Sequence, residues 1–206
     1  MLAWAMLACA VAMPCAAAAE ELDPTAVLRA LARPAPSATA FVEVRGSALL
    51  KQPLHISGEY RRPDRDTLVR EVKSPYRETT TISGGQAVIA REGKPVQRYA
   101  LDRVPELAGV QSSFGALLEG DTQALERQYE ISAQGTPRHW QLQLLPRDAA
   151  LRKRVRALNL YGDGAELRCV ATQPTRGDVQ RTLLGAAAAQ AGSGDVAAQC
   201  EQGLGR

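Results

Sequence analysis

Short segments in which apolar and polar residues alternate follow one another between Leu54 and Ile89. They cover residues 54–60, 67–72, 76–82 and 87–89, and turns rich in glycine, proline and aspartate separate them. A period of two is typical of strands that bury one face, and no helical segment interrupts the series. Because parallel strands need long crossover connections, this spacing predicts a curved antiparallel meander.

Similar segments before and after this region extend the prediction to roughly ten or eleven strands in one domain. A helix is expected to begin at Asp23 and Pro24, since aspartate caps helices and proline fits their first turn. Three short helix-prone pieces cover residues 102–126, between two groups of strands. The further strands are expected over residues 41–50, 96–101, 128–133, 139–145, 155–161, 166–172 and 178–184.

The two ends of the chain differ in composition from the middle. Residues 1–19 carry no charged side chain and end in four alanines before Glu20, which predicts a signal peptide cleaved near Ala19 and export to the periplasm. A transmembrane anchor is the alternative, although Pro14 interrupts the apolar stretch. The folded domain is then expected over residues 20–184, and residues 185–206 form an Ala/Gly-rich tail expected to be mobile, with little to pack.

Two of the four cysteines lie in the predicted signal peptide, which leaves Cys169 and Cys200. In an oxidising compartment this pair can form a disulfide worth roughly 3 to 4 kcal/mol. The other interpretation is a buried Cys169, on the same strand face as Leu167 and Ala171, with an unpaired Cys200 in the tail.

The sequence contains no pattern typical of catalysis. His55 and His139 have neither a nucleophile signature nor metal spacing around them, and no phosphate-binding loop is present. Carboxylates such as Glu59, Asp64, Glu71 and Glu78 fit a solvated strand face. We therefore expect no enzyme activity, no cofactor and no metal. The formal charge of +3 is small and the basic residues are scattered, which argues against nucleic acid as a partner.

A long curved sheet with only a few short helices to cover it leaves room for an apolar ligand. The most distinctive motifs, in chain order, are the strand from Phe41 to Arg45 and residues 58–63, 74–78, 81–86, 117–121, 129–133, 140–146 and 155–165. In these motifs and in the order of its elements, the chain resembles the family of the periplasmic lipoprotein carrier LolA.

The resemblance implies a single-domain, mainly β fold with α: an unclosed antiparallel β-barrel covered by the N-terminal helix and short lid helices. It also implies a cavity that shelters acyl chains of lipoproteins in transfer from the inner to the outer membrane. Arg62 matches the family's arginine that holds the lid closed, and lid backbone carbonyls are its expected partners. The lining of the cavity is expected to include Ile56, Tyr60, Leu68, Phe114, Leu117, Leu118, Trp140, Leu142 and Leu144.

The expected partners are acylated lipoproteins or other lipids, an inner-membrane release complex and an outer-membrane acceptor, and the protein is expected to be a monomer. Aromatic residues make up only 4% of the chain, which keeps open a carrier of another lipid or lipid-linked product. A non-enzymatic periplasmic accessory module that holds a protein partner on a sheet edge is the remaining alternative.

Overall fold

The computed structural model describes residues 22–45, 53–103, 115–191 and 195–202. The predicted signal peptide and Phe114 lie outside these residues, as does the end of the strand expected over residues 41–50.

The described residues form one 11-stranded sheet in which every pairing is antiparallel, in the order β6-β5-β4-β3-β2-β1-β11-β10-β9-β8-β7. Strands that are neighbours in sequence pair with each other, except β6 and β7, and the first strand pairs with the last one. The sheet therefore consists of two meanders joined at β1 and β11. Strands β6 and β7 form its two edges, so the barrel is not closed. The bounds are β1 Ser37–Arg45, β2 Leu54–Arg62, β3 Leu68–Ser74, β4 Glu78–Ser83, β5 Gln86–Arg91, β6 Gln97–Ala100, β7 Tyr129–Gly135, β8 His139–Pro146, β9 Val155–Asp163, β10 Glu166–Pro174 and β11 Gln180–Leu184.

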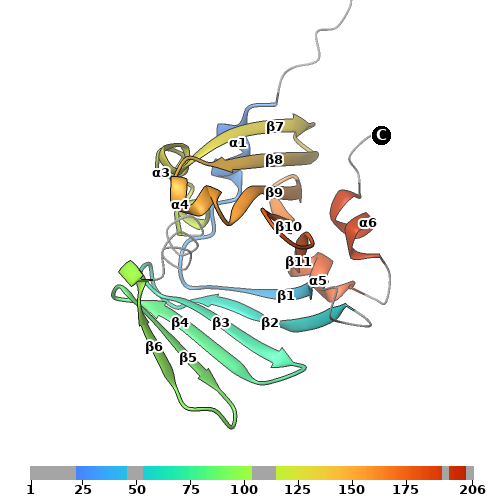
Figure 1. Cartoon of the computed structure of the whole chain (residues 1–206). Helices are drawn as coiled ribbons and strands as arrows, with labels where there is room; N and C mark the ends of the chain where they lie inside the picture. Colours follow the sequence, from blue (N-terminus) through green and yellow to red (C-terminus); the bar gives the residue numbers. More distant parts are fainter. Residues whose placement is uncertain (1–21, 46–52, 104–114, 192–194, 203–206) are drawn as a thin grey trace, which may run out of the picture.

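The sheet bends so that its two halves face each other across a concave side (Figure 1). We call β2–β6 the N-terminal wing and β7–β10 the C-terminal wing. The prediction of a mainly β, unclosed antiparallel barrel with helices is confirmed.

Helix α1 (Pro24–Ala30) begins where the sequence predicts, with the Asp23 carboxylate accepting a hydrogen bond from the Thr25 amide at 2.8 Å. Its apolar residues enter the core cluster of the C-terminal wing, where Val27, Leu28 and Leu31 pack with Leu142 of β8. A helix of this length is marginally stable by itself, and burial of its apolar face supplies most of its stability. Helix α1 therefore fills the concave side next to β7 and β8.

The remaining helices on this side are short. They comprise η1 (Leu101–Arg103), a helical turn over residues 115–119, α3 (Thr122–Gln128) and α4 (Ala149–Arg152). Helix α4 was not predicted from the sequence; Asp148 caps it through the Leu151 amide at 2.7 Å.

A register shift between Ser57 and Gly58 marks a bulge where β2 meets β3. A Cβ at Gly58 would lie 1.9 Å from the Glu71 carbonyl oxygen and 3.0 Å from the Phe41 ring. Only glycine therefore lets the two backbones and the ring approach this closely.

The expectation that residues after Leu184 have little to pack is wrong. They form α5 (Gly185–Ala189) and α6 (Val196–Glu201), which cover the convex side of β10 and β11. Ala187, Ala188 and Val196 are buried there. Small side chains allow a helix to lie close to a sheet, so an alanine-rich segment can pack although it offers little apolar bulk.

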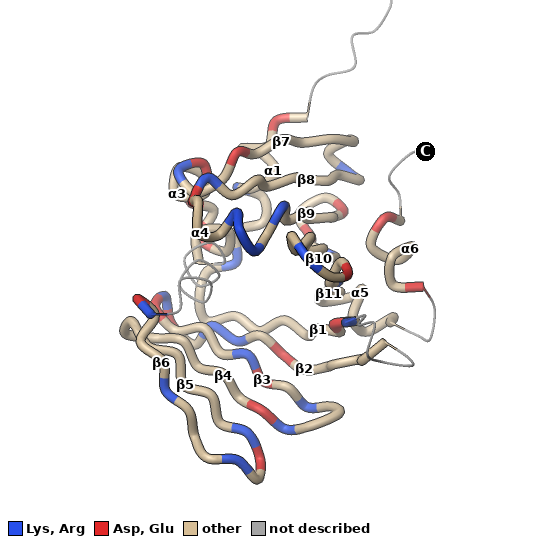
Figure 2. Tube along the Cα trace, in the orientation of Figure 1, with Lys and Arg blue, Asp and Glu red and all other residues tan. Residues whose placement is uncertain are grey.

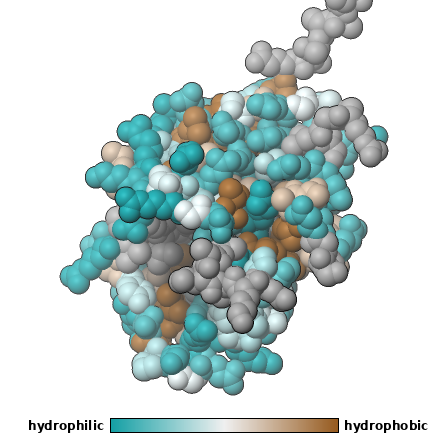
Figure 3. All heavy atoms as spheres, turned by 45° about the vertical axis from the view of Figure 1, so that its right-hand side comes forward, coloured by the Kyte–Doolittle hydropathy of each residue, from teal (hydrophilic) through white to brown (hydrophobic). Residues whose placement is uncertain are grey.

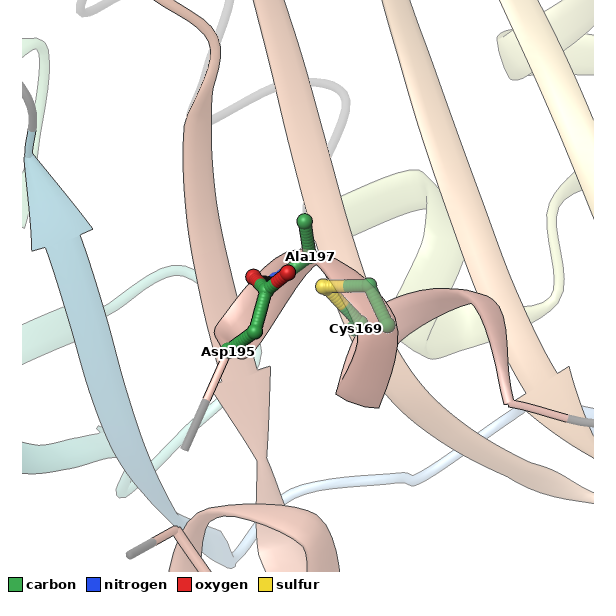
Figure 4. The surroundings of a disulfide bond; sticks show 4 residues. Cys169, Asp195 and Ala197 are labelled. Carbon is green, nitrogen blue, oxygen red and sulfur yellow. Dashed lines mark hydrogen bonds between the residues drawn. A yellow bond between two sulfur atoms is a disulfide. The ribbon is translucent and has the colours of Figure 1, made fainter. Parts of the chain in front are cut away.

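Cys169 of β10 and Cys200 of α6 form a disulfide, with Cα atoms 5.3 Å apart. Figure 4 shows Cys169 beside the first turn of α6, where Asp195 caps the Ala197 amide. A bulge between Leu167 and Cys169 places these two residues on opposite faces of β10, so the expected shared face is wrong for Leu167.

Candidate functional site

A hollow of about 270 Å³ lies on the concave side of the sheet. The C-terminal wing and its helices form an apolar wall. Brown, apolar atoms come to the surface in the middle of the molecule, between the teal outer faces, in Figure 3. The apolar lining consists of Leu117, Leu125, Tyr129, Leu144, Leu151, Val155, Leu158, Leu160, Val170 and Leu184. We call this space the inner hollow.

The opposite wall of the inner hollow is polar. It consists of Glu43, Arg45, Tyr60, Arg70, Gln180 and Thr182, and Thr172 of β10 adds a polar group to the lining. Figure 2 shows basic and acidic residues interspersed over the N-terminal wing, whereas β8 is tan along its length. The inner hollow therefore presents an apolar wall and a charged wall to the same ligand.

The charged side chains of this wall belong to a row of ion pairs that continues across the concave face of the sheet, from β1 through β3 and β4 to β5. Glu43 accepts hydrogen bonds from Arg45 through one oxygen and from Arg70, at 2.7 Å, through the other. Arg70 lies 4.0 Å from Glu78, which lies 3.9 Å from Arg91. We call these five residues the charge row.

Tyr60 and Phe41 support the buried part of the row. The Arg70 guanidinium lies 4.8 Å from the centre of the Phe41 ring, which in turn lies 4.8 Å from the Tyr60 ring. Burial raises the pKa of the Tyr60 hydroxyl, so Tyr60 is neutral at neutral pH. Burial acts to lower the pKa of Arg70, but the nearby Tyr60 and Glu43 outweigh it and raise this pKa overall.

A second hollow of about 190 Å³ adjoins the first, because Tyr60, Leu117 and Leu184 line both. Arg62 and Leu118 also line it. We call it the outer hollow.

Arg62 lies at the end of β2 with only 3% of its surface exposed. Its guanidinium donates to the Glu119 carboxylate at 3.1 Å, to the Arg65 carbonyl at 3.2 Å and to the Arg33 carbonyl at 3.4 Å. The Arg33 amide in turn donates to the Leu118 carbonyl at 2.7 Å. These bonds join the end of β2, the segment after α1 and the helical turn over residues 115–119. Among the described residues, the partners of Arg62 are therefore one carboxylate and two carbonyls outside that turn. The expected lid carbonyl partners stay a prediction, because residues 104–114 lie outside the described residues.

Glu119 is held by two arginines. Arg65 donates to both of its oxygens, at 3.0 and 2.9 Å, and Arg62 adds the third bond. The hydrogen bond from Arg65 is the main reason that the pKa of Glu119 is lowered, and the charge of Arg65 and the bond from Arg62 add to it. Glu119 therefore stays ionised at neutral pH. We call Arg62, Arg65 and Glu119 the lock.

The structure brings together only part of the expected lining. Tyr60, Arg62, Leu117, Leu118 and Leu144 line the two hollows. Four expected lining residues do not line either hollow and are buried within packed clusters, namely Ile56, Leu68, Trp140 and Leu142.

The reason for this difference is that neighbouring side chains already cover those four residues. Trp140 and Leu142 are buried in one cluster with the apolar residues of α1, and Ile56 is buried in another with Phe41 and Val72. Ile82 and Leu101 pack on Leu68.

Sequence reasoning missed the charge row. Arg70 lies between Leu68 and Val72 in a period-two pattern, which places its charge on the apolar face of β3, and this was the available signal. Glu59 and Glu71 form ion pairs with Arg61, as expected for a solvated face. Glu78 belongs to the charge row instead.

The family model described as "Outer membrane lipoprotein carrier protein LolA-like" matches residues 16–204. The chain belongs to this LolA-like family. The match spans both wings of the sheet, both hollows and the disulfide, so the expected resemblance is confirmed. A search of curated protein sequences found no match.

Solved structures of similar proteins include a LolA superfamily protein from Nitrosomonas europaea. It has 9% sequence identity and a TM-score of 0.40, and the alignment covers 77% of this chain and 88% of that one. The MucA/MucB complex of Pseudomonas aeruginosa matches with 19% identity and a TM-score of 0.40, over 85% of this chain and 62% of that chain.

Family membership supports the theme of a carrier for hydrophobic ligands. Within the described ranges, no helix has the length and apolarity needed to cross a membrane.

Proposed function

We propose that this protein is a non-enzymatic periplasmic carrier that shelters acyl chains in the inner hollow. The observation that carries the proposal is the apolar wall of the C-terminal wing, which remains open to a ligand on the concave side of the sheet. Membership of the LolA-like family supports a carrier role.

The free energy of hydration explains why such a ligand needs shelter. Each methylene group exposed to water costs about 0.8 kcal/mol, so a chain of about sixteen carbons costs roughly 12 kcal/mol. A leucine-lined wall recovers much of this cost, because it offers dispersion contacts along the chain.

Release requires that the empty, closed state be stable too. The lock joins the end of β2 to the helical turn that carries Leu117 and Leu118, and both leucines line the outer hollow. Each of its bonds contributes on the order of 1 kcal/mol, so together they make closure favourable but reversible. A ligand that needs the turn displaced then competes with the lock.

Two kinds of cargo fit this carrier. The family description favours the acyl chains of lipoproteins on their way to the outer membrane, together with a membrane donor and acceptor. The charge row favours instead another lipid or lipid-linked product, because lipoprotein acyl chains offer no charge where they join the protein.

Native mass spectrometry of the protein purified gently from the periplasm tests the proposal. We expect additional masses that correspond to bound lipid, and their identification separates the two kinds of cargo. Val170→Trp would fill the inner hollow and is expected to remove the bound lipid. The matched control is Val69→Trp, on the convex face of β3, which should retain it.

Both variants should be checked for a native-like melting transition, since overpacking costs about 1–3 kcal/mol. Wild-type protein that neither carries lipid nor takes up added acyl chains would refute the carrier role. Equal lipid content in folded Val170→Trp would refute the inner hollow as its site.

A further inference from the structure

The charge row carries one more positive than negative charge. Arg45, Arg70 and Arg91 alternate with Glu43 and Glu78, and the two glutamates are each shared between two arginines. Both oxygens of Glu43 already accept hydrogen bonds. At the inner hollow itself, the lining holds Arg45 and Arg70 but only one carboxylate, that of Glu43.

The middle of the charge row is buried, whereas the Arg45 and Arg91 side chains are partly exposed. The Arg70 side chain is 18% exposed and that of Glu43 only 7%, so their pair is largely withdrawn from solvent. Arg45 and Arg70 both line the hollow with the single Glu43 carboxylate between them, and at 43% exposure the Arg45 side chain keeps N–H donors accessible. A second anion at this place would share them, because guanidinium binds carboxylate and phosphate oxygens in the same planar geometry.

The position of the charge row relative to the apolar wall determines how a ligand would be oriented in the inner hollow. Leu158 and Leu160 of β9 lie on the wall opposite Arg70, and Thr182 of β11 lies on the polar wall beside Glu43, its register partner. A ligand with a hydrocarbon chain at one end and a negative charge at the other would satisfy both walls at once.

We infer that the inner hollow selects amphiphiles with an anionic end, a carboxylate or a phosphate, which Arg45 and Arg70 bind while the chain lies along β8–β10. This rests on the proposed carrier function and specifies the polar end of its cargo.

Binding of four C16 probes to the full chain, by calorimetry at fixed pH and moderate salt, tests the inference. The probes are hexadecanoate, hexadecyl phosphate, hexadecanol and hexadecyltrimethylammonium. We expect the two anions to bind at least about tenfold more tightly than the alcohol, and the cation to bind most weakly. The tighter of the two anions then identifies carboxylate or phosphate as the preferred end.

Two variants should shift this preference in opposite directions. Arg45→Gln balances the charges of the row and should abolish the preference for anions, whereas Glu43→Gln raises the excess and should increase it. Arg61→Gln is the matched control, because Arg61 carries the same charge on the opposite face of β2 and is 48% exposed. A thermal melt of each variant establishes that it is folded.

Hexadecanol that binds as tightly as the anions would overturn the inference and leave the carrier function standing. A preference for anions in Arg45→Gln equal to that in Arg61→Gln would overturn the inference as well. Failure of all four probes to bind would instead overturn the carrier function itself.

Discussion

Loss of the disulfide between β10 and α6 should destabilise the protein strongly without removing its ligand site. The perturbation is either reduction of the bond or the Cys200→Ala substitution. Cys169 and Cys200 are separated by 31 residues in the sequence and both are buried. The bond joins the C-terminal helices to the convex side, whereas the inner hollow lies on the concave side.

The size of the effect follows from the length of the closed loop. For a sequence separation of 31 residues, the chain-entropy relation gives about 4 kcal/mol at 25 °C. For a domain of this size, each kcal/mol corresponds to about 2–4 °C in melting temperature, so the transition should fall by about 8–15 °C.

Urea unfolding of a chain that begins at Glu20 measures this difference, because Cys9 and Cys15 are then absent. The oxidised and reduced wild-type proteins differ only in the cross-link. Reduced wild type and Cys200→Ala differ only in packing of the buried sulfur. Hexadecanoate affinity, measured below the unfolding transition, should be the same in all three.

A difference of less than about 1 kcal/mol between oxidised and reduced protein would refute the reasoning. It would mean that α6 holds the same place through packing alone, or that the reduced unfolded chain is already compact. A large loss of affinity in folded, reduced protein would show that the tail supports the ligand site.

Three other changes have defined outcomes. Arg62→Leu removes the three hydrogen bonds of the Arg62 guanidinium, so a larger fraction of the protein should be open. The apparent ligand affinity should then rise about tenfold or more, with slower release of the ligand. Arg61→Leu is the control, and unchanged ligand binding in Arg62→Leu would contradict a gating role. The pKa of Glu119 is lowered in the folded protein, so its stabilising effect is present above the ordinary carboxyl pKa of about 4 and is lost as the pH falls through the folded pKa. The difference in unfolding free energy between wild type and Glu119→Gln should therefore be constant near pH 7 and shrink below about pH 4. A difference that does not depend on pH would count against the lock. Gly58→Ala should cost about 1–3 kcal/mol in urea unfolding because its Cβ meets the Glu71 carbonyl, whereas Gly115→Ala, with open space around it, should cost nothing; equal effects would contradict the tight bulge.

Local sequence patterns predicted most of the strands and the first helix. Period-two alternation predicted strands over residues 139–145 and 155–161. These segments start at the same residues as β8 and β9 and end one and two residues earlier. The Asp23–Pro24 pair predicted the start of α1. These features depend on contacts within a few residues, which a single sequence contains.

The candidate site was only partly predictable, because an apolar residue lines a hollow only where no distant part of the chain packs on it. Leu142 and Leu144 share one face of β8, yet only Leu144 lines the inner hollow. Glu119 became a partner of Arg62 through a contact across 57 residues of sequence.

The sequence by itself determined most of the strands and the start of the first helix. Only the tertiary structure decided that α1 fills one end of the concave side, that an alanine-rich tail packs on the convex side, and that Glu43 and Arg70 meet beside an apolar wall. The physical reason is that these outcomes depend on the curvature of the sheet. Curvature sets which distant faces come close enough to exclude water, and no local pattern records that distance.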